Sequence, residues 1–525
     1  MDTIGLKNIV VSLILALFVG WTWRVLNWVW VKPRKMEKCL RQQGFHGNSY
    51  RFLSGDNKEN SEMVKNALLK PINLSDDAVA RAIPFIHHTV EKYGKNSFMW
   101  FGPAPRLLVT DPELIKEVMN KNNIFKKIKQ NPIVRMFSHG LASIYGDQWA
   151  QYKKLLAPAF HLHKLKNIAL MLPVMYISCT ELVSKWEEKV EKNGWCELDI
   201  APYLHTLTSD VILCTSFGSS YKEGHKLTSD GSRVFEIQRQ QIELVMKSLQ
   251  SVYISGWRFL PTKNNRKMKE LNEMIQSSLK NIISKKTKAM QARESSSDDL
   301  LGILLESISS DQLQNGSRNV GMSLDDVIGE CKFFYFAGQE TTSNILVWTI
   351  ILLVVHPNWQ IRAREEVLQV LGNHGKPDFD NLNHLKIVTM ILHEVLRLYP
   401  PAHTLNRKVY EDTTLGGLKL PAGMEVAVPL LLLHYDQNLW GEDAKEFDTE
   451  RFAQGVSKAT KSIQAAYFPF RWGPRLCLGH DFAMLETKLA LATILQHFSF
   501  ELSASYTHAP ATLITLQPQY GDNLQ

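Results

Sequence analysis

A long apolar run near the N-terminus is the feature that most constrains this chain. Residues 9–31 read IVVSLILALFVGWTWRVLNWVWV, with Arg24 and Asn27 as the strongly polar members. A membrane-spanning helix needs about 20 predominantly apolar residues. Both polar residues lie toward the C-terminal end of the run, where a long side chain reaches the headgroups, and the four tryptophans there are typical of an interfacial belt. The run therefore predicts a membrane anchor.

The residues around the apolar run distinguish a membrane anchor from a cleaved signal peptide. A signal peptide has a shorter apolar core and a small-residue cleavage site, whereas no such site follows this run. Positive charge is denser after the run than before it, where only Lys7 stands, so the positive-inside rule places the rest of the chain in the cytosol. We expect an anchor over residues 1–32 and one catalytic domain over residues 33–525.

Composition and charge narrow the class of protein. The 525 residues are 45% hydrophobic and 21% charged, as is ordinary for a globular protein. The net charge of +8 is spread without a basic run, so the sequence indicates no nucleic-acid partner. The six cysteines include no C-x-x-C pair and no dense framework, which disfavours a zinc site, an iron–sulfur site and disulfides.

Helical periodicity dominates the chain past residue 45. The helices that it predicts cover residues 182–190, 268–290, 300–307, 324–355, 358–371 and 387–398. Strand-like pieces are few and short, at residues 107–109, 408–410, 417–420 and 425–428. The predicted fold class is therefore mainly α with a small β region, and the most polar connection lies over residues 292–319.

A polar notch interrupts the longest predicted helix. Ser323 and Asp326 resemble a capping box that opens this helix. Its middle, residues 337–342, reads AGQETT, and an acid and two hydroxyl groups inside a buried helix are unfavourable. One interpretation is a partly exposed turn of a core helix. The other is a groove that holds a small ligand, with Glu340 and Thr341 handling protons.

A cysteine near the C-terminus lies in a loop with unusual composition. Residues 468–488 read FPFRWGPRLCLGHDFAMLETK, and Cys477 precedes an apolar-periodic helix whose N-terminus stabilises a thiolate. Gly473 permits a tight turn and Gly479 permits close approach of a bulky flat group, while Phe470 is positioned to shield the sulfur. A shielded, hydrogen-bonded thiolate is the ligand that helps haem iron to cleave the O–O bond.

This loop resembles the haem-binding signature of the cytochrome P-450 superfamily, Phe-x-x-Gly-x-Arg-x-Cys-x-Gly. Three other segments resemble motifs of that family: residues 337–341 its oxygen-activation motif, Glu394-x-x-Arg397 its structural helix motif, and residues 447–452 its meander. The segments LRQQGFHGNSYRFL, FYFAGQETT and WGEDAKEF are similar to the plant secologanin-synthase-like subfamily (the seventy-second family, subfamily A). The resemblance covers the whole chain.

The resemblance implies the family's helical prism around haem b (iron protoporphyrin IX), with one N-terminal transmembrane helix. It implies Cys477 as the axial ligand of the haem iron and Glu340 with Thr341 as the catalytic pair that relays protons. The implied buried network consists of Glu394, Arg397 and Arg451. The other cofactor-binding positions are Trp149, Lys153, Arg407, Phe470, Arg475 and Gly479, and the substrate positions are Ala337, His403 and Thr404.

The activity that the resemblance implies is insertion of one oxygen atom from dioxygen into an unactivated C–H bond of a terpenoid, either an iridoid or a triterpenoid. Electrons would come from NADPH through NADPH–cytochrome P-450 reductase, and the chain itself has no dinucleotide fingerprint. The implied location is the endoplasmic reticulum membrane, single-pass, with the catalytic domain facing the cytosol. Lys153, Lys154, Lys164 and Lys166 offer the reductase a basic docking surface.

Three positions depart from the family pattern: Lys153 replaces an arginine, Arg471 a small residue and Thr449 a common proline. These departures keep open a divergent, non-catalytic haem protein. A haem-thiolate isomerase or dehydratase that acts on a peroxide is a second alternative, although that class commonly lacks the acid–threonine pair. A metal hydrolase built on His161 and His163 would lack an accompanying H-E-x-x-H helix.

Overall fold

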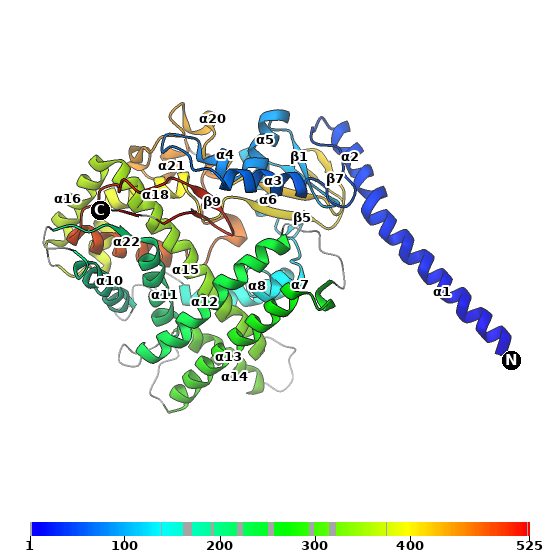
Figure 1. The fold of residues 1–525 in the computed structure, drawn as a ribbon, viewed down its shortest axis with the longest axis horizontal. Helices are drawn as coiled ribbons and strands as arrows, with labels where there is room; N and C mark the ends of the chain where they lie inside the picture. Colours follow the sequence, from blue (N-terminus) through cyan, green and yellow to red (C-terminus); the bar gives the residue numbers. More distant parts are fainter. Residues whose placement is uncertain are drawn as a thin grey trace.

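The structure is a computed structural model that describes residues 3–524 except 138, 161–170, 191–193, 218–223, 250–256, 293–298, 314–321, 374, 462 and 522. Helices predominate in this part of the chain, and a small sheet lies to one side of them (Figure 1). The α-helices are α1 (Thr3–Leu26), α2 (Lys32–Gln42), α3 (Asn57–Leu68), α4 (Ala78–Ala82), α5 (Pro84–Tyr93), α6 (Pro112–Asn120), α7 (Pro132–Phe137), α8 (Gly146–Leu156), α10 (Met171–Glu187), α11 (Ala201–Phe217), α12 (Gly224–Leu249), α13 (Lys263–Gln291), α14 (Leu300–Leu313), α15 (Leu324–Val355), α16 (Pro357–Leu371), α17 (Phe379–His384), α18 (Lys386–Leu398), α19 (Leu430–His434), α20 (Gln437–Trp440), α21 (Val456–Ala459) and α22 (His480–His497).

The main sheet has five strands in the order β1-β2-β8-β5-β3. Its strands are β1 (Phe98–Phe101), β2 (Ala104–Leu108), β3 (Phe125–Lys126), β5 (Leu405–Val409) and β8 (Glu425–Val428). The central strand β8 is buried along its length, and it pairs in parallel with β2 and antiparallel with β5. Two-stranded sheets pair β6 (Thr413–Leu415) with β7 (Leu418–Leu420), β9 (Pro510–Thr512) with β10 (Leu516–Pro518), and β4 (Leu198–Asp199) with β11 (Asn523–Leu524). The predicted class, mainly α with a small β region, is confirmed.

α15 forms the centre of the fold and begins where the capping box predicts. The Ser323 hydroxyl accepts a hydrogen bond from the Asp326 amide, and the Asp326 carboxylate accepts one from the Ser323 amide, each at 3.1 Å. The helix runs unbroken through the polar notch and packs against α11, α18 and α22. It is long and apolar enough to span a membrane, but most of its side chains are buried inside the protein.

Several predicted helices occur with small differences at their ends. α13, α16 and α18 cover the predicted residues 268–290, 358–371 and 387–398. The prediction over 182–190 was wrong at both ends, because α10 begins at Met171 and stops at Glu187. The helix predicted over 300–307 continues to Leu313, so the polar connection is shorter than expected, and most of what remains of it lies outside the described residues.

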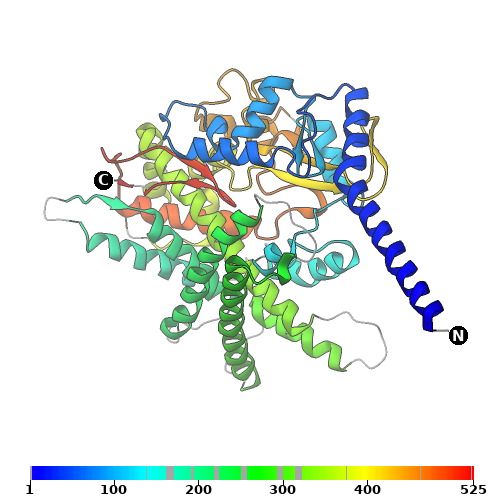
Figure 2. The same ribbon diagram turned by 45° about the vertical axis from the view of Figure 1, so that its right-hand side comes forward.

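The predicted anchor is a helix that projects away from the rest of the molecule in both ribbon views (Figures 1 and 2). The large apolar side chains between Val11 and Trp23 are exposed, and so are Ile9 and Leu26. α1 continues through a short π-helical turn, Asn27–Val31, into α2 without a break. The helix is apolar and long enough to cross a bilayer, with hardly any of its apolar segment buried in the protein.

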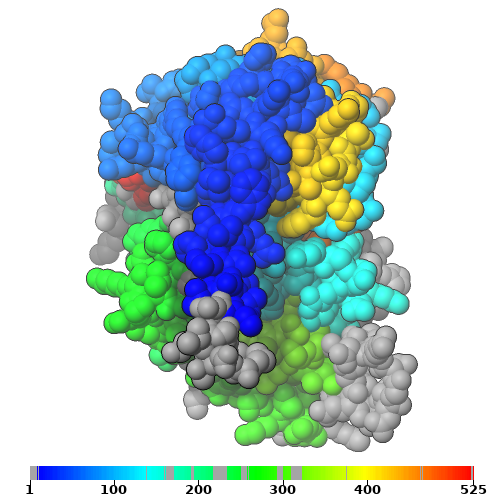
Figure 3. All heavy atoms as spheres, turned by 90° about the vertical axis from the view of Figure 1, so that its right-hand side faces the viewer, coloured from blue at the N-terminus to red at the C-terminus, as the bar shows by residue number. Residues whose placement is uncertain are grey.

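The last residues of the apolar run pack on the folded body rather than projecting from it. Val29 is buried, and its carbonyl accepts a hydrogen bond from the Tyr50 hydroxyl at 2.6 Å. A little further on, Gln43 and the β7 residue Lys419 exchange two hydrogen bonds, and Figure 3 shows this blue N-terminal segment beside the yellow one. The anchor is therefore joined to the sheet side of the molecule through a helix that has its own contacts there.

Candidate functional site

The cysteine loop is shaped by one tight turn and one backbone hydrogen bond. Gly473 adopts φ +68°, and a Cβ there would lie 3.1 Å from the Met119 carbonyl oxygen, so the turn requires glycine. The Cys477 amide donates to the Phe470 carbonyl at 2.9 Å, which closes the loop. Gly479 then caps α22, and a Cβ built on it would meet nothing within 4 Å. The space beside Gly479 is therefore open.

The Cys477 side chain faces an enclosed space. It is solvent-accessible, yet protein surrounds it deeply enough that burial raises the pKa of its thiol. Together the two observations place Cys477 in a recess that solvent reaches and protein encloses on most sides. The Gly479 amide and the charge of Arg471 act in the opposite direction on this pKa. The helix N-terminus thus favours the thiolate as the sequence indicates, but burial outweighs it in the chain alone.

Four cationic side chains, Lys127, Arg407, Arg471 and Arg475, lie close enough to feel one another's charges, and Arg471 also interacts with Cys477. Burial and then the charges of its neighbours Arg471, Arg475 and Arg407 hold the pKa of Lys127 well below its usual range. Burial, and then the charge of Arg471, lowers the pKa of Arg407 to about 9 and that of Arg475 to about 10. Within the described part of the chain, none of the four forms an ion pair with a carboxylate.

Trp149 and Lys153 complete the group from α8. The Arg475 guanidinium lies 3.9 Å from the centre of the Trp149 ring, and the Lys153 ammonium lies 5.3 Å from it. Arg475 Nη2 donates to the Ile144 carbonyl at 3.0 Å, while its Nη1 is buried without a partner. Lys153 donates to the Pro474 carbonyl at 2.6 Å.

This set of residues fits haem b. Buried cations without counter-charges are costly, and the two propionates of haem would supply the missing carboxylates. The cysteine sulfur and the open space beside Gly479 suit an iron ligand and a flat ring. Lys127 was not predicted from the sequence, because nothing near it in the chain marks it as part of this group.

The polar notch of α15 is partly accessible rather than fully buried. Thr341 Oγ1 donates to the Ala337 carbonyl at 2.7 Å. The Glu340 carboxylate accepts from Thr515 Oγ1 at 2.7 Å, with Asn344 Nδ2 at 3.5 Å. Glu340 is buried, whereas Ala337 and Thr341 retain some accessible surface. The acid thus faces into a hydrogen-bonded interior, and the threonine lies at its edge.

Gly338 serves helix packing. A Cβ on Gly338 would lie 2.6 Å from Ile212 Cδ1, so α11 can approach α15 this closely only at a glycine.

The two other predicted substrate positions follow the double proline after α18. His403 Nδ1 lies 3.0 Å from Thr404 Oγ1. Burial lowers the pKa of His403 to about 4, although the side chain keeps some accessible surface. Like Cys477, it therefore lines an internal space in its neutral form.

Glu394, Arg397 and Arg451 form a buried ionic network. Arg397 binds the Glu394 carboxylate with two hydrogen bonds of 2.6 and 2.8 Å, and both side chains are fully buried. Arg451 Nε lies 3.6 Å from the same carboxylate. Arg397 also donates to the carbonyls of His434, Ala444 and Glu446, which ties α18 to the segment before the cysteine loop.

The two other residues that depart from the family pattern, Arg471 and Thr449, have structural consequences of their own. Arg471 holds φ +68°, a backbone conformation that non-glycine residues rarely adopt. Thr449 is fully buried, and its hydroxyl has no hydrogen-bond partner. His161, His163, Lys164 and Lys166 lie outside the described residues. Among the residues that are described, no group of three or more histidine, cysteine or acidic side chains is arranged to hold a metal ion.

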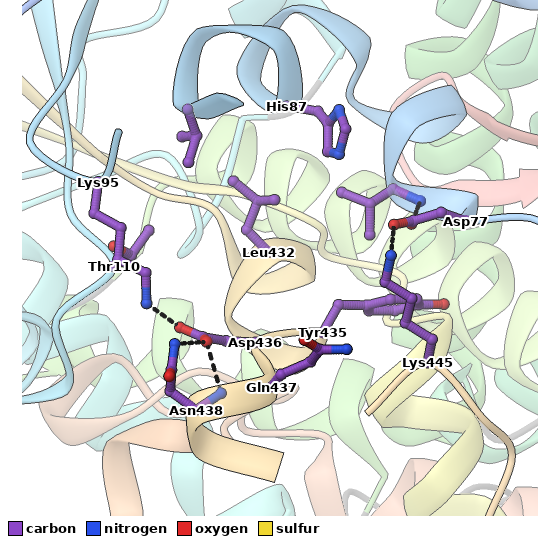
Figure 4. A pocket seen from close by; sticks show the side chains of 12 residues that line it. Asp77, His87, Lys95, Thr110, Leu432, Tyr435, Asp436, Gln437, Asn438 and Lys445 are labelled. Atoms are coloured by element: carbon purple, nitrogen blue, oxygen red, sulfur yellow. Dashed lines mark hydrogen bonds and ion pairs between the residues drawn. The ribbon is translucent and has the colours of Figure 1, made fainter. Parts of the chain in front are cut away.

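A separate surface pocket of about 290 Å³ contains none of the predicted site residues (Figure 4). Its charges are already paired, with Lys445 bound to Asp77 at 2.8 Å and Lys95 bound to Asp436. In this respect it differs from the space around Cys477, where the cations lack counter-charges.

The chain belongs to the cytochrome P-450 family, because residues 82–520 match that family. It is similar over almost its whole length to cytochrome P-450 72A397 of Kalopanax septemlobus, with 64% identity over 96% of this chain and 95% of the relative. Secologanin synthase 1 of Catharanthus roseus is 49% identical, over 100% of this chain and 98% of the relative. The 7-deoxyloganic acid hydroxylase of Catharanthus roseus is 48% identical, over 99% of each.

This membership settles the class of enzyme. The chain is a cytochrome P-450 monooxygenase that uses haem b, with electrons supplied from NADPH through a reductase. The suspected secologanin-synthase-like resemblance is confirmed by the same relatives.

Proposed function

We propose that this enzyme oxidises an unactivated C–H bond of a terpenoid, either an iridoid or a triterpenoid, with Cys477 as the axial ligand of its haem. The observation that carries the site is the group of unpaired buried cations beside the Cys477 sulfur. The iridoid class is supported by the names of two relatives, secologanin synthase and 7-deoxyloganic acid hydroxylase. The triterpenoid class rests on the sequence resemblance alone.

The chain's own residues would bind and orient the cofactor. Arg407, Arg475, Lys153 and the Trp149 ring would hold the propionates, because guanidinium groups and an indole N–H suit buried carboxylates. Phe470 and Gly479 would flank the sulfur and the ring. When bound, haem supplies the activation of dioxygen, which no protein side chain provides.

Glu340 and Thr341 of α15 would hold and supply protons for the chemistry of the bound haem. The Thr341 hydroxyl is held by the Ala337 carbonyl of the preceding turn, and the Glu340 carboxylate is held by Thr515. A carboxylic acid and a hydroxyl at adjacent positions of one helix suit stepwise proton transfer to a ligand in the groove. Ala337, His403 and Thr404 would contact the substrate.

Membrane and reductase contacts complete the proposal. Residues 1–32 would form the anchor and residues 33–525 the catalytic domain, in the endoplasmic reticulum membrane with the domain in the cytosol. Lys153 and the exposed Lys154 would contribute to a basic surface for an acidic reductase face.

The first test is the carbon monoxide difference spectrum of the reduced protein. We expect a band at about 450 nm for the wild type and its loss in Cys477→Ala, because only a thiolate ligand gives this band. Cys39→Ala is the matched control and is expected to retain the band, since Cys39 contacts the Lys419 carbonyl of β7 and takes no part in the cysteine loop. A band at about 450 nm in Cys477→Ala contradicts the assignment of the ligand.

The second test uses purified enzyme, reductase, NADPH and a panel of 7-deoxyloganic acid and pentacyclic triterpenoid acids. We expect NADPH-dependent oxygenation of at least one member. Conversion of a hydroperoxide without NADPH would favour the isomerase or dehydratase, and no oxygenation of either class overturns the proposed substrate class.

A further inference from the structure

The α11 residue His205 contacts the oxygen-activation segment of α15 from outside the site described above. Its Nδ1 lies 2.7 Å from Gln339 Nε2 and 2.9 Å from Ser343 Oγ. Both partners carry a hydrogen that they can donate, so Nδ1 is the acceptor and the neutral ring has its proton on Nε2. One imidazole therefore joins two residues of α15 that lie one helical turn apart.

Other residues on the same face of α11 approach the same turn. Thr208 Oγ1 lies 3.2 Å from the Gln339 carbonyl, and Ile212 packs against Gly338. The spacing of His205, Thr208 and Ile212 places all three on one face of the helix. This face of α11 therefore covers the backbone of residues 338–343.

The partners of His205 adjoin Glu340. Gln339 precedes the acid in the chain, and Ser343 Oγ lies 3.2 Å from the Glu340 carbonyl oxygen. No hydrogen bond from His205 or Ser343 reaches the Glu340 carboxylate, which is held by Thr515. His205 can thus fix the turn that carries the acid, but it does not pass a proton to it directly.

Burial keeps the His205 ring in the neutral form that accepts these hydrogen bonds, against the two facing carboxylates. Burial lowers the pKa of His205; Glu340 on α15 and Asp199 on β4 raise it, and Arg239 on α12 lowers it further. A neutral ring accepts at Nδ1, whereas a protonated ring cannot accept at either nitrogen.

We propose that His205 is a positioning residue for proton delivery, which holds Gln339 and Ser343 so that Glu340 and Thr341 keep a fixed orientation on α15. The inference rests on the proposed role of Glu340 and Thr341. It adds a residue from a different helix, 135 positions before the acid.

The test compares two substitutions of His205 in the haem-loaded, full-length protein. His205→Leu removes the acceptor while keeping an apolar side chain of moderate size. His205→Asn places an amide oxygen near the position of Nδ1 and restores the acceptor without a ring. Thr215→Val is the matched control, because Thr215 is buried on the same helix and its hydroxyl donates only to the Val211 carbonyl.

Two quantities are measured. The first is the C–O stretching band of the reduced carbon monoxide complex, which senses the side chains in the α15 groove and needs no substrate. The second is the product formed per NADPH with a terpenoid that the wild type oxidises. We expect His205→Leu to shift or broaden the band and to lower product per NADPH about tenfold, the effect of losing about one hydrogen bond's orientation.

The remaining readouts separate positioning from folding. In His205→Leu we expect the 450 nm band and the substrate-binding constant to stay within about twofold of wild type. His205→Asn and Thr215→Val stay near wild type in both the stretching band and product per NADPH. If His205→Leu fails to retain haem, Gln339→Ala takes its place. This substitution removes the donor of the hydrogen bond to His205 Nδ1, and it is expected to shift the C–O stretching band in the same way.

Three results overturn the inference: an unchanged band and yield in His205→Leu, equal losses in His205→Asn and His205→Leu, or an unchanged band in the substitute Gln339→Ala. Failure of the proposed function is recognised separately. It appears in the wild type, as a missing 450 nm band or as no oxygenated terpenoid, before any substitution at His205 is made.

Discussion

The buried network of Glu394, Arg397 and Arg451 gives the sharpest prediction of stability. The change is Glu394→Gln, which keeps the size of the side chain and removes its charge. Arg397 then remains a fully buried cation with no carboxylate beside it, although its carbonyl partners persist. Removing one partner of a buried ion pair costs about 3–5 kcal/mol, because the other charge is left uncompensated.

The expected shift in melting temperature follows from the size of the protein. Unfolding entropy is about 2.1 cal/mol/K per residue, which for the roughly 490 residues after the anchor amounts to about 1 kcal/mol/K. A loss of about 3–5 kcal/mol therefore lowers the melting temperature by about 3–5 °C. The assay is thermal loss of the 450 nm band and of helical circular dichroism at one fixed scan rate.

A matched control exists on α6. Glu113 and Lys116 have the same i,i+3 spacing as Glu394 and Arg397, but they lie 3.9 Å apart and both are exposed. Glu113→Gln is expected to change stability by less than about 1 kcal/mol. Equal shifts for Glu394→Gln and Glu113→Gln would refute the reasoning, since burial of the partner is the reason for the difference.

Two further predictions concern acid stability and cofactor retention. Burial lowers the pKa of His434 to about 3, below the ordinary value of 6.5. The stability that this residue contributes is therefore complete above pH 6.5. It is lost as the pH falls, because the unfolded chain takes up the proton first. At pH 4.5 the loss is about 2–3 kcal/mol, and His434→Gln is expected to lose less stability than wild type between pH 7 and pH 4.5 in chemical unfolding. Arg475→Met removes the guanidinium that stacks on Trp149. It is expected to speed haem transfer to apomyoglobin about 10- to 100-fold. Lys154→Met, on the exposed side of α8, is the control and is expected to change the transfer rate less than about twofold. An equal effect of the two substitutions would contradict the role of Arg475.

The ends of α15 could be predicted because local chemistry determines them. Ser323 and Asp326 form the capping box, and Pro357 lies just beyond the last helical residue. The reason for Gly338 could not be predicted in the same way. Glycine is needed at this position because Ile212 of another helix lies against it. Nothing in the sequence near either residue indicates that the two are in contact.

In the candidate site, too, local motifs could be predicted from the sequence and contacts between distant residues could not. The motif around Cys477 indicates the iron ligand because its residues are close in sequence. Lys127 and His205 act across large separations in the chain, and isolated lysines and histidines resemble ordinary surface or core residues. Their importance depends on the charges and donors that folding brings beside them, and one sequence without relatives does not reveal those neighbours.

The unbroken path from α1 through the π-helical turn into α2 also has a consequence for orientation. A flexible linker would let the catalytic domain rotate freely above the bilayer, but a continuous helix transmits the rotational setting of the span to the domain. Each residue added to a helix rotates the chain beyond it by about 100°. Which face of the domain lies toward a bilayer that the helix enters, and which faces away from it, therefore depends on the number of residues in this junction.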